Sequence, residues 1–512
     1  MDKGNIFKKS ALLGYINMIV VMFIGIVSQP MMLNQLGEIQ FGIWTITLNL
    51  LTYIGNSNVG IPGAALVYIA KSKDNNERKN IVKRSFLLLT IVSIIVGIMF
   101  LLFITIFPNW IGIIGDLENE FYYIAKISII ISVVLFLIRS PLQLAQSAFS
   151  GFQDIHINKI YELLNTLVPF ISLIVIIIFD KSIIALASIV GIGYIIVNLM
   201  ATIHLLTKYK ILKNTSINNE LILDTKVTYK DLLKSGFEFF VIGIGSALIY
   251  NTDSLVISNF VDISKISNYN FTFKLYQMAV QVMNIFTGIS MPLYGAAYVA
   301  KNYKWISKIY NNMTILFPIF AGAIWIGGML IGRDILVIWA GNENIFENYI
   351  LLFVFGAFVY SLAIVNVNST FLSGIDKKKE TARLIWIEAI LNLVLSIILS
   401  KYMGITGVAT ATLISSLLIP YIFLPKYINK YTNGIIKFKF NNIFKHFSIA
   451  ILPLIIFVSL FREYIYKQEY IIKFVIVIII MLIYFILSYV LIENKYKKEY
   501  KNILLEKLNK NK

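Results

Sequence analysis

The sequence predicts an all-α polytopic membrane protein of about fourteen transmembrane helices, in two pseudo-symmetric six-helix lobes with two extra C-terminal helices. The 512 residues are 58% hydrophobic and only 14% charged, whereas soluble proteins carry nearly twice that charged fraction. Apolar runs of about 20 residues, the length that crosses a bilayer, recur from end to end. Similar patterns also recur about 225 residues apart, which indicates an internal repeat.

Each apolar run defines one expected spanning helix, and the thirteenth is the shortest. In chain order we expect them near residues 11–33, 43–68, 82–107, 122–142, 159–179, 183–206, 236–260, 268–294, 311–332, 349–373, 382–401, 405–425, 446–461 and 471–491.

The charges of the loops predict the orientation of these spans. Alternate loops are rich in Lys and Arg, as in Lys71–Arg84, and the intervening loops carry acids such as Glu38, Asp116 and Asp262. Because basic loops stay in the cytoplasm, both termini are expected there. The net charge of +18 then reports topology and attraction to anionic membrane lipids, so nucleic acid is not an expected partner. The tail Lys495–Lys512 has the spacing of a surface amphipathic helix, although a solvated tail fits equally well.

The repeat predicts the domain organisation. Ala148–Gly151, which closes the fourth span, matches Phe371–Gly374, which closes the tenth. An even number of spans per copy gives both copies the same orientation, as in alternating-access transporters. The expected parts are an N-lobe (1–206), a cytoplasmic loop (207–235), a C-lobe (236–425), and a last segment with two helices and a basic tail (426–512).

Two rows of polar residues at helical spacing are the candidate binding residues. The eighth span has five on one face, and the second span has four at matching repeat positions. We expect both rows to line a central cavity, although hydrogen bonding between helices is the alternative. The residues are Thr45, Asn49, Thr52 and Asn56 in the second span, and Asn270, Lys274, Gln277, Gln281 and Asn284 in the eighth.

Asp253 in the seventh span and Lys274 in the eighth are the deepest charges in the sequence. Each costs about 2.5–3.5 kcal/mol at a bilayer centre, so each needs a partner or a task. Asp253 is the candidate ion-coupling residue, and a structural ion pair with Lys274 is the alternative. Arg139 lies near the cytoplasmic end of the fourth span, where snorkelling to the headgroups would explain it.

Enzyme signatures and metal-ligand patterns are missing from the sequence. The chain has no cysteine, and its histidines, His156, His204 and His446, are widely spaced. No Walker A motif occurs, so this chain is not expected to hydrolyse ATP. We therefore expect no catalytic residues, metal site or cofactor.

Several motifs together resemble the Wzx-type polysaccharide and O-antigen repeat-unit flippases of the multidrug/oligosaccharidyl-lipid/polysaccharide (MOP) exporter superfamily. The resemblance covers about the first twelve spans. The motifs are Leu36–Trp44 after the first helix, Thr252–Ser258 with its Asp in the seventh, Phe371–Gly374, Asn392–Ser396, and Gly404–Ala411.

The resemblance implies an inner-membrane flippase that moves undecaprenyl-diphosphate-linked oligosaccharides from the cytoplasmic to the outer leaflet. It further implies coupling to a cation, H⁺ or Na⁺, as in an antiporter, and a polysaccharide polymerase as a further partner. Cavities in this family are often rich in cations, whereas Lys274 is the one clear deep cation here. The alternatives are an ion-coupled multidrug exporter of the same superfamily and a membrane-embedded glycan polymerase.

Overall fold

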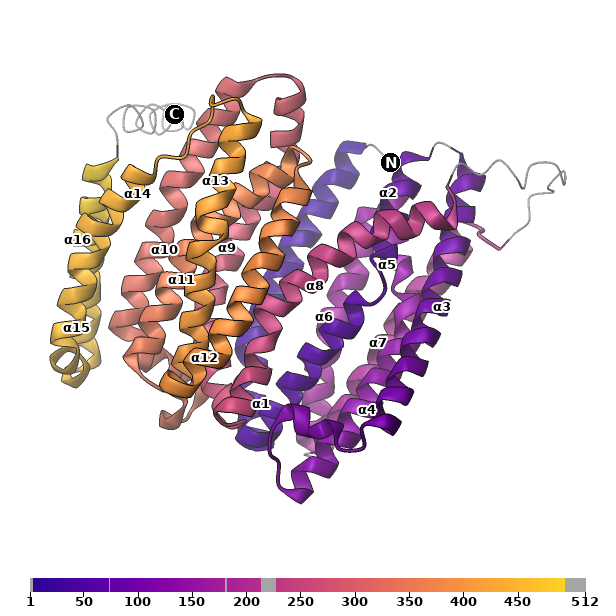
Figure 1. Ribbon diagram of the computed structural model, residues 1–512, viewed down its shortest axis with the longest axis horizontal. Coiled ribbons are helices and arrows are strands. Elements are labelled where there is room, and N and C mark those ends of the chain that lie inside the picture. The colour runs from indigo at the N-terminus through magenta and orange to yellow at the C-terminus, as the bar shows by residue number, and fades with distance from the viewer. Residues whose placement is uncertain (1–2, 73, 180–181, 213–226, 493–512) are drawn as a thin grey trace. The chain divides into compact units, whose positions relative to one another are not determined.

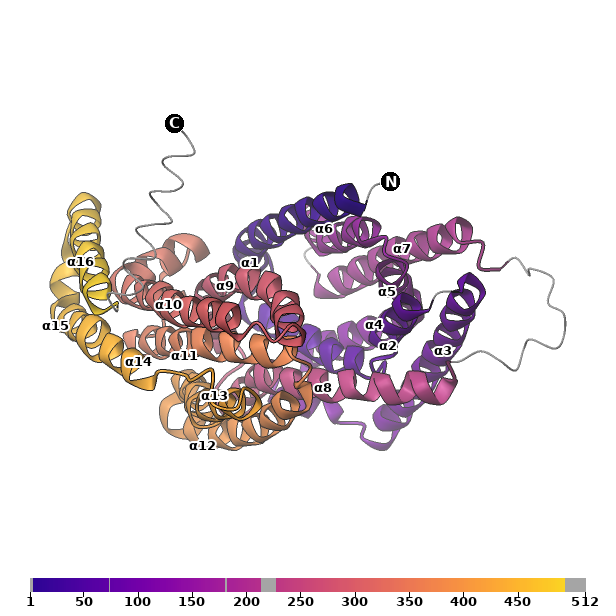
Figure 2. The same cartoon turned by 90° about the horizontal axis from the view of Figure 1, so that it is seen from above.

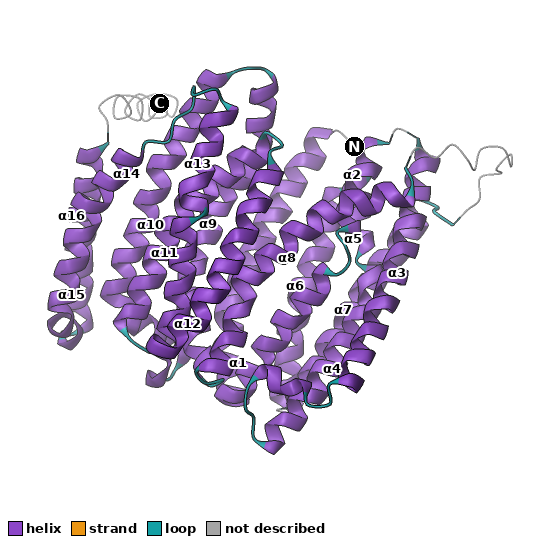
Figure 3. Ribbon diagram, in the orientation of Figure 1, coloured by secondary structure: helices purple, strands orange, loops and turns teal. Residues whose placement is uncertain are grey.

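The computed structural model describes residues 3–72, 74–179, 182–212 and 227–492, and within these ranges every regular element is a helix (Figure 3). This confirms the predicted all-α class. The helices are α1 (Lys3–Asn56), α2 (Ile61–Lys71), α3 (Asn75–Ile106), η1 (Trp110–Ile114), α4 (Asn119–Leu142), α5 (Leu144–Gly151), α6 (Ile155–Phe179), α7 (Ile183–Lys208), α8 (Tyr229–Phe260), α9 (Lys265–Val299), α10 (Tyr303–Ala340), η3 (Glu343–Ile345), α11 (Tyr349–Gly374), α12 (Lys378–Leu418), α13 (Pro420–Tyr431), α14 (Phe440–His446), η4 (Phe447–Ile451), α15 (Leu452–Lys467) and α16 (Tyr470–Leu491).

Two of the long helices are pairs of helices joined end to end. Gly37 in α1 has φ 77° and Gly404 in α12 has φ 58°, a left-handed conformation that glycine adopts without a Cβ clash. Each break separates two predicted spans. In the described ranges, eleven segments are long and apolar enough to cross a membrane. Two of these contain the breaks, and α9 with its 35 residues adds another helix of sufficient length, so the arrangement is consistent with fourteen spans.

The predicted second span, 43–68, is not one continuous helix. Helix α1 ends at Asn56 and α2 begins at Ile61, and Gly60 between them is left-handed with φ 63°. Pro62 follows in the first turn of α2, where its missing N–H costs nothing. Ser57, Asn58 and Gly60 are typical of a turn, but they are too few to interrupt a span that is judged by its apolar content alone.

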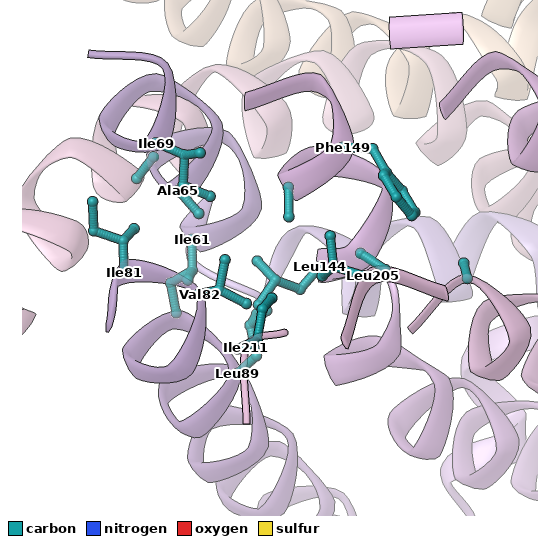
Figure 4. Packing of buried hydrophobic residues seen from close by; sticks show 14 of the residues in the cluster. Ile61, Ala65, Ile69, Ile81, Val82, Leu89, Leu144, Phe149, Leu205 and Ile211 are labelled. Carbon is teal, nitrogen blue, oxygen red and sulfur yellow. The ribbon is translucent and has the colours of Figure 1, made fainter. Parts of the chain in front are cut away.

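The N-terminal unit (Met1–Ser267) is a compact group containing α1 to α8. Helix α7 packs along α4 and α6, and α8 packs along α1 and α2 (Figure 1). At the end that carries α2 and α5, a buried apolar cluster joins α2, α3, α5 and α7, with Ile61, Leu89, Phe149 and Leu205 among its members (Figure 4). This close packing fixes the α2 end of the unit.

The C-terminal unit (Asn268–Lys512) is built around α10 and α11, which pack along each other. Helices α12 and α13 cover α11, and the last pair, α15 and α16, lies against α10 (Figure 2). Lys473 Nζ on α16 and Asp334 Oδ2 on α10 form an ion pair at 3.0 Å. The two extra C-terminal helices are therefore attached to the unit through α10.

The boundary between the compact units falls between Ser267 and Asn268, so α8 belongs to the N-terminal unit by its contacts. The sequence repeat instead assigned 236–260 to the C-lobe. The six-span lobes with boundaries at 206 and 236 therefore stay a prediction, since duplication and packing are different criteria. Parts of the predicted loop (213–226) and of the tail (493–512) lie outside the described residues.

Candidate functional site

The polar row predicted on the second span lies on α1 along its contact with α8. Asn49 Nδ2 donates to Ser254 Oγ at 3.1 Å, and one turn later the Tyr53 hydroxyl donates to the Ala247 carbonyl oxygen at 3.2 Å. These bonds join residues about 200 positions apart in the sequence. We call this contact of α1 and α2 with α8 the α1–α8 seam, and it continues from Gly42 to Gly60 on one side and from Ile263 back to Gly236 on the other.

The other members of the first row are bonded mainly to their own helix. Thr52 Oγ1 donates to the Leu48 carbonyl at 3.0 Å, and Asn56 Nδ2 donates to the Thr52 carbonyl at 3.0 Å. Thr52 is exposed, whereas Thr45 and Asn56 are half-buried. These groups keep acceptor oxygens that the helix does not use, so they remain able to bind a polar ligand.

Small residues let the two sides of the seam approach closely. A Cβ added at Gly42 would lie 2.7 Å from the Ile263 carbonyl oxygen, and one added at Gly236 would lie 3.1 Å from the Gly60 carbonyl carbon. Helices pack backbone to backbone in membranes where small residues permit it. The seam is therefore closed by main-chain contact at Gly60 and Gly236.

Asp253 lies on α8 within the seam and is buried, with 5% of its surface exposed. The adjacent Ser254 accepts the hydrogen bond from Asn49, and the Tyr53 hydroxyl lies within electrostatic range of the Asp253 carboxylate. The ion-coupling candidate and the first polar row thus meet at one place. Lys274 belongs to the other compact unit, so its pairing with Asp253 stays a prediction.

The second polar row lies on the less buried side of α9. Its opposite side carries the buried Tyr276 and Met283, and the ring of Tyr276 stacks on that of Phe355 on α11 with centroids 6.4 Å apart. Asn284 Oδ1 accepts a weak hydrogen bond from Asn366 Nδ2 at 3.4 Å. The half-buried members are Asn270, Lys274, Gln277 and Gln281, and Asn284 is exposed. This side is where cavity-lining residues would lie, and that role stays a prediction.

Arg139 on α4, for which the sequence position suggested snorkelling, packs against α7. Its guanidinium lies over the ring of Tyr194 on α7, with Cζ 3.8 Å from the ring centroid. The Gln143 amide, with its oxygen toward the guanidinium, accepts from Nε at 2.8 Å and from Nη2 at 2.9 Å. The group is thus turned into the N-terminal unit, a placement that needs α7 and could not be derived from α4 alone.

Helix α12 carries a buried polar row, and two of its members, Asn392 and Ser396, bound one of the motifs of the family resemblance. Glu388, Asn392 and Ser396 follow one another at four-residue spacing and are all buried. Asn392 Nδ2 donates to Thr412 Oγ1 at 2.9 Å, but Asn392 Oδ1 and Ser396 Oγ are buried without a hydrogen-bond partner among the described residues. The spacing was visible in the sequence, and a search for polar residues at i, i+4 and i+8 in every span would have found the row.

Asp154, in the turn between α5 and α6, holds a charged cluster outside the spans. Lys208 Nζ lies 2.7 Å from Asp154 Oδ2, and the Tyr209 hydroxyl donates to the same carboxylate. Burial raises the pKa of Asp154, but the hydrogen bonds from Lys208 and Tyr209 outweigh it and bring the pKa below its ordinary value. The cluster ties the end of α7 to the start of α6.

Metal-binding geometry does not occur among the described residues, since no group of three or more His, Cys, Asp or Glu side chains lies close enough together to hold an ion. The site therefore consists of neutral polar side chains, a buried carboxylate and an inward-facing guanidinium. In an apolar helical bundle, such groups are candidates for a pathway or a binding site of a polar solute, and this role stays a prediction here.

The fold is that of the MOP transporters. The chain is similar to a lipid II flippase, MurJ, in its inward closed conformation, with a TM-score of 0.68, 15% identity, and coverage of 93% of this chain and 97% of that one. It is also similar to an inward-facing multidrug resistance MATE family transporter of the MOP superfamily, with a TM-score of 0.67, 12% identity, and coverage of 81% and 94%. A MOP superfamily transporter from Pyrococcus furiosus matches with a TM-score of 0.60, 14% identity, and coverage of 85% and 96%.

The family of this protein follows from a match of its sequence to a family model. The model of the polysaccharide biosynthesis protein family matches residues 6–298, more than half of the chain, so this protein belongs to that family. Among curated proteins, no sequence matches the chain. The protein is thus a multi-pass membrane protein of the polysaccharide biosynthesis family with the MOP transporter fold.

Proposed function

We propose that this protein is a flippase for undecaprenyl-diphosphate-linked oligosaccharide repeat units, such as those of an O-antigen. It would move them from the inner to the outer leaflet of the bacterial cytoplasmic membrane by alternating access, with both termini in the cytoplasm. One observation carries the proposal: polar rows whose members are mostly half-buried lie on the long helices α1 and α9 of a polysaccharide biosynthesis family member. Asn, Gln and Thr side chains donate and accept hydrogen bonds, as sugar hydroxyls do.

The polar rows on α1 and on α9 would each bind sugar hydroxyls. Their side chains are satisfied partly by their own helices, as with Thr52 and Asn56, so a sugar could bind without leaving buried groups unpaired. One protein with this fold is named a lipid II flippase, which supports a lipid-linked substrate.

Asp253 would couple transport to a cation, H⁺ or Na⁺. It is a buried carboxylate within the α1–α8 seam, so its charge affects the same contact that holds Asn49. Binding of a cation would neutralise the carboxylate and lower the cost of burying it, which would favour the conformation in which the seam is closed. An ion pair with Lys274 that only fixes the fold is the competing explanation.

The test replaces Asp253 in a strain that depends on this protein for its surface polysaccharide. Asp253→Asn keeps the size of the side chain and removes the charge, so we expect surface polysaccharide to be lost while the protein still inserts at normal levels. Asp262→Asn, in the exposed turn that follows α8, is the matched control and should export normally. Normal surface polysaccharide in Asp253→Asn would rule out the coupling role.

A double-mutant cycle separates the two explanations of Asp253. If Asp253 and Lys274 form only a structural pair, Asp253→Asn combined with Lys274→Gln should recover much of the activity that either change removes. If Asp253 couples the ion, the double variant should be as inactive as Asp253→Asn alone.

A multidrug exporter is the second candidate, because the fold is also similar to that of a multidrug resistance MATE transporter. Deletion would then raise drug sensitivity and leave surface polysaccharide unchanged. Accumulation of lipid-linked sugar on the inner leaflet with unchanged drug sensitivity would instead support the flippase.

A further inference from the structure

Two turns, one in each compact unit, share the same backbone geometry. After α5, the N–H of Asp154 donates to the carbonyl oxygen five residues earlier at 2.8 Å, and Gln153 is left-handed with φ 69°. After α11, the N–H of Lys377 donates in the same way at 2.8 Å, and Asp376 is left-handed with φ 60°. Each is a Schellman turn, and the two are separated by the predicted repeat distance of about 225 residues. They therefore hold equivalent positions in the predicted repeat.

The last helix of each predicted six-helix lobe ends in a further turn of this kind. After α7, Lys210 has φ 50°, and the N–H of Ile211 donates to the carbonyl oxygen five residues earlier at 3.1 Å. After α13, Asn433 has φ 49°, and the N–H of Gly434 donates in the same way at 2.9 Å. Since backbone hydrogen bonds form all four turns, the turns do not depend on the side chains beside them.

In the N-terminal unit, side chains join the turn after α5 to the end of α7. The Tyr209 hydroxyl donates to the Asp154 carboxylate, and Lys208 Nζ lies 2.7 Å from Asp154 Oδ2. The ring of Tyr209 also stacks on that of Phe152, with the two centroids 3.8 Å apart. We call Asp154, Lys208 and Tyr209 the N-clasp. It ties the end of the sixth predicted span to the turn that follows the fourth.

In the C-terminal unit, side chains join the start of α12 to the end of α13. The Tyr431 hydroxyl donates to the Glu380 carboxylate, and Lys377 Nζ lies 4.8 Å from the centroid of the Tyr431 ring. The Tyr298 hydroxyl on α9 donates to the Tyr431 carbonyl oxygen at 3.1 Å. We call Lys377, Glu380 and Tyr431 the C-clasp. It ties the end of the twelfth predicted span to the segment that follows the tenth.

The two clasps make the same kind of contact with different residues. Lys377 holds the repeat position of Asp154, so an acid in one unit is replaced by a base in the other. Tyr431 likewise holds the repeat position of Lys208. Each clasp nevertheless has one Tyr hydroxyl on a carboxylate with a lysine beside it. The contact recurs although its residues differ, which indicates that both units use the tie itself.

Each clasp acts where a helix opens most easily. The last turn of a helix has four carbonyl groups without intrahelical partners, and helix ends open at low free energy. A hydroxyl that donates to a charged carboxylate makes a stronger bond than two neutral groups do. The clasps place such bonds at the ends of α7 and α13. They therefore resist separation of these ends from the rest of their unit.

We propose that the N-clasp and the C-clasp are conformational devices that lock the predicted cytoplasmic end of each unit, so that each unit moves as one body during transport. This inference rests on the proposed flippase function with its alternating access. Motion at one end of a unit reaches its other end only if the helices within the unit stay together. Release of a clasp would let α7 or α13 separate at that end, and part of the motion would be lost.

The first measurement is hydrogen–deuterium exchange of the purified full-length protein in nanodiscs. Tyr209→Phe removes the hydroxyl and keeps the ring that stacks on Phe152, so the variant should fold. We expect amide exchange in residues 205–209 to become at least tenfold faster and exchange in residues 428–432 to stay unchanged. Tyr431→Phe should give the reverse pattern. Glu380→Leu removes the acceptor of the same bond and should match Tyr431→Phe.

The second measurement is the rate at which pulse-labelled sugar reaches the surface in a strain that depends on this protein. At equal membrane levels, Tyr209→Phe and Tyr431→Phe should each lower this rate at least threefold. Tyr122→Phe is the matched control, because it removes a hydroxyl that donates to the Pro108 carbonyl oxygen at 3.4 Å, at the opposite end of α4 from α5. It should leave the transport rate and the exchange at both clasps unchanged.

Each outcome supports or overturns a separate conclusion. Unchanged exchange in Tyr209→Phe and Tyr431→Phe would show that the clasps do not hold the helix ends, and would overturn the proposal. Faster exchange with wild-type transport rates would also overturn it, since the clasps would then only stabilise the fold, and the flippase proposal would stand. A wild-type protein that restores no surface polysaccharide to a deletion strain would instead contradict the proposed function, and the clasps' role in transport with it.

Discussion

Closure of the α1–α8 seam depends on glycine at position 236, and Gly236→Ala tests this directly. Gly236 lies in the first turns of α8 with ordinary helical geometry, so alanine meets no backbone strain there. Its new methyl group would, however, clash with the Val59 carbonyl oxygen and lie 3.1 Å from the Gly60 carbonyl carbon and 3.2 Å from Ile61 N. These are main-chain atoms at the start of α2, so no side-chain rotation can relieve the clash.

The size of the effect follows from two opposing contributions. Alanine is favoured over glycine inside a helix by about 0.5–1 kcal/mol. Overpacking in a close-packed interior costs about 1–3 kcal/mol. The difference predicts a loss of up to about 2.5 kcal/mol in the free energy of unfolding, with a middle value of about 1 kcal/mol. Gly60→Ala should cost more, because the left-handed φ of 63° adds backbone strain to a clash at the same place.

Thermal unfolding of the detergent-purified protein, followed by tryptophan fluorescence, measures this loss. Gly14→Ala is the control, because Gly14 is also helical and an added Cβ there meets nothing within 4 Å. We expect the control to unfold at or slightly above the wild-type temperature and Gly236→Ala to unfold several degrees lower. Equal unfolding temperatures for the two variants would show that α8 does not contact α2 as described.

Two further predictions concern ion pairs, one within each compact unit. Lys473→Met should lower the free energy of unfolding by about 3–5 kcal/mol, since it leaves the Asp334 carboxylate partly buried without its lysine. Adding Asp334→Asn should recover much of that loss in the same unfolding assay, and a double variant less stable than the single one would refute the pairing. The lowered pKa of Asp154 predicts that its contribution to stability is complete above the ordinary pKa of a carboxyl group and disappears as the pH falls through the lowered value. Wild-type protein should therefore lose more thermal stability on acidification below about pH 4 than Asp154→Asn, in which Lys208 and Tyr209 face a neutral amide, and parallel pH profiles would contradict this.

The spans could be predicted from the sequence because each is encoded locally. A run of about 20 apolar residues marks a helix whatever its neighbours are. The breaks were harder, since the turns at Gly37 and Gly404 interrupt helices that continue on both sides. The turn before α2 was missed because a count of apolar residues passes over a short interruption, although Asn58, Gly60 and Pro62 are typical of a turn.

For the candidate site, too, the sequence predicted the features that lie within one helix. The rows on α1 and α9 follow from helical spacing, which the sequence displays directly. The sequence does not show the hydrogen-bond partners of these residues, since Asn49 bonds to Ser254, which lies 205 residues later in the chain. For Arg139, the position in α4 indicated snorkelling, and the contact of its guanidinium with the ring of Tyr194 on α7 could not be derived from α4 alone.

Helix α8 shows why the repeat and the packing divide the chain differently. The predicted repeat would place α8 in the second copy. The structure shows one conformation, in which Asn49, Tyr53 and Gly60 all contact α8. In an alternating-access mechanism a helix at the boundary must exchange such contacts, and side-chain hydrogen bonds of about 1 kcal/mol each together with glycine contacts can separate without a large loss of free energy. The proposed mechanism therefore predicts that Gly236→Ala, which loosens the same seam, shifts the protein toward the conformation in which α8 has left α2.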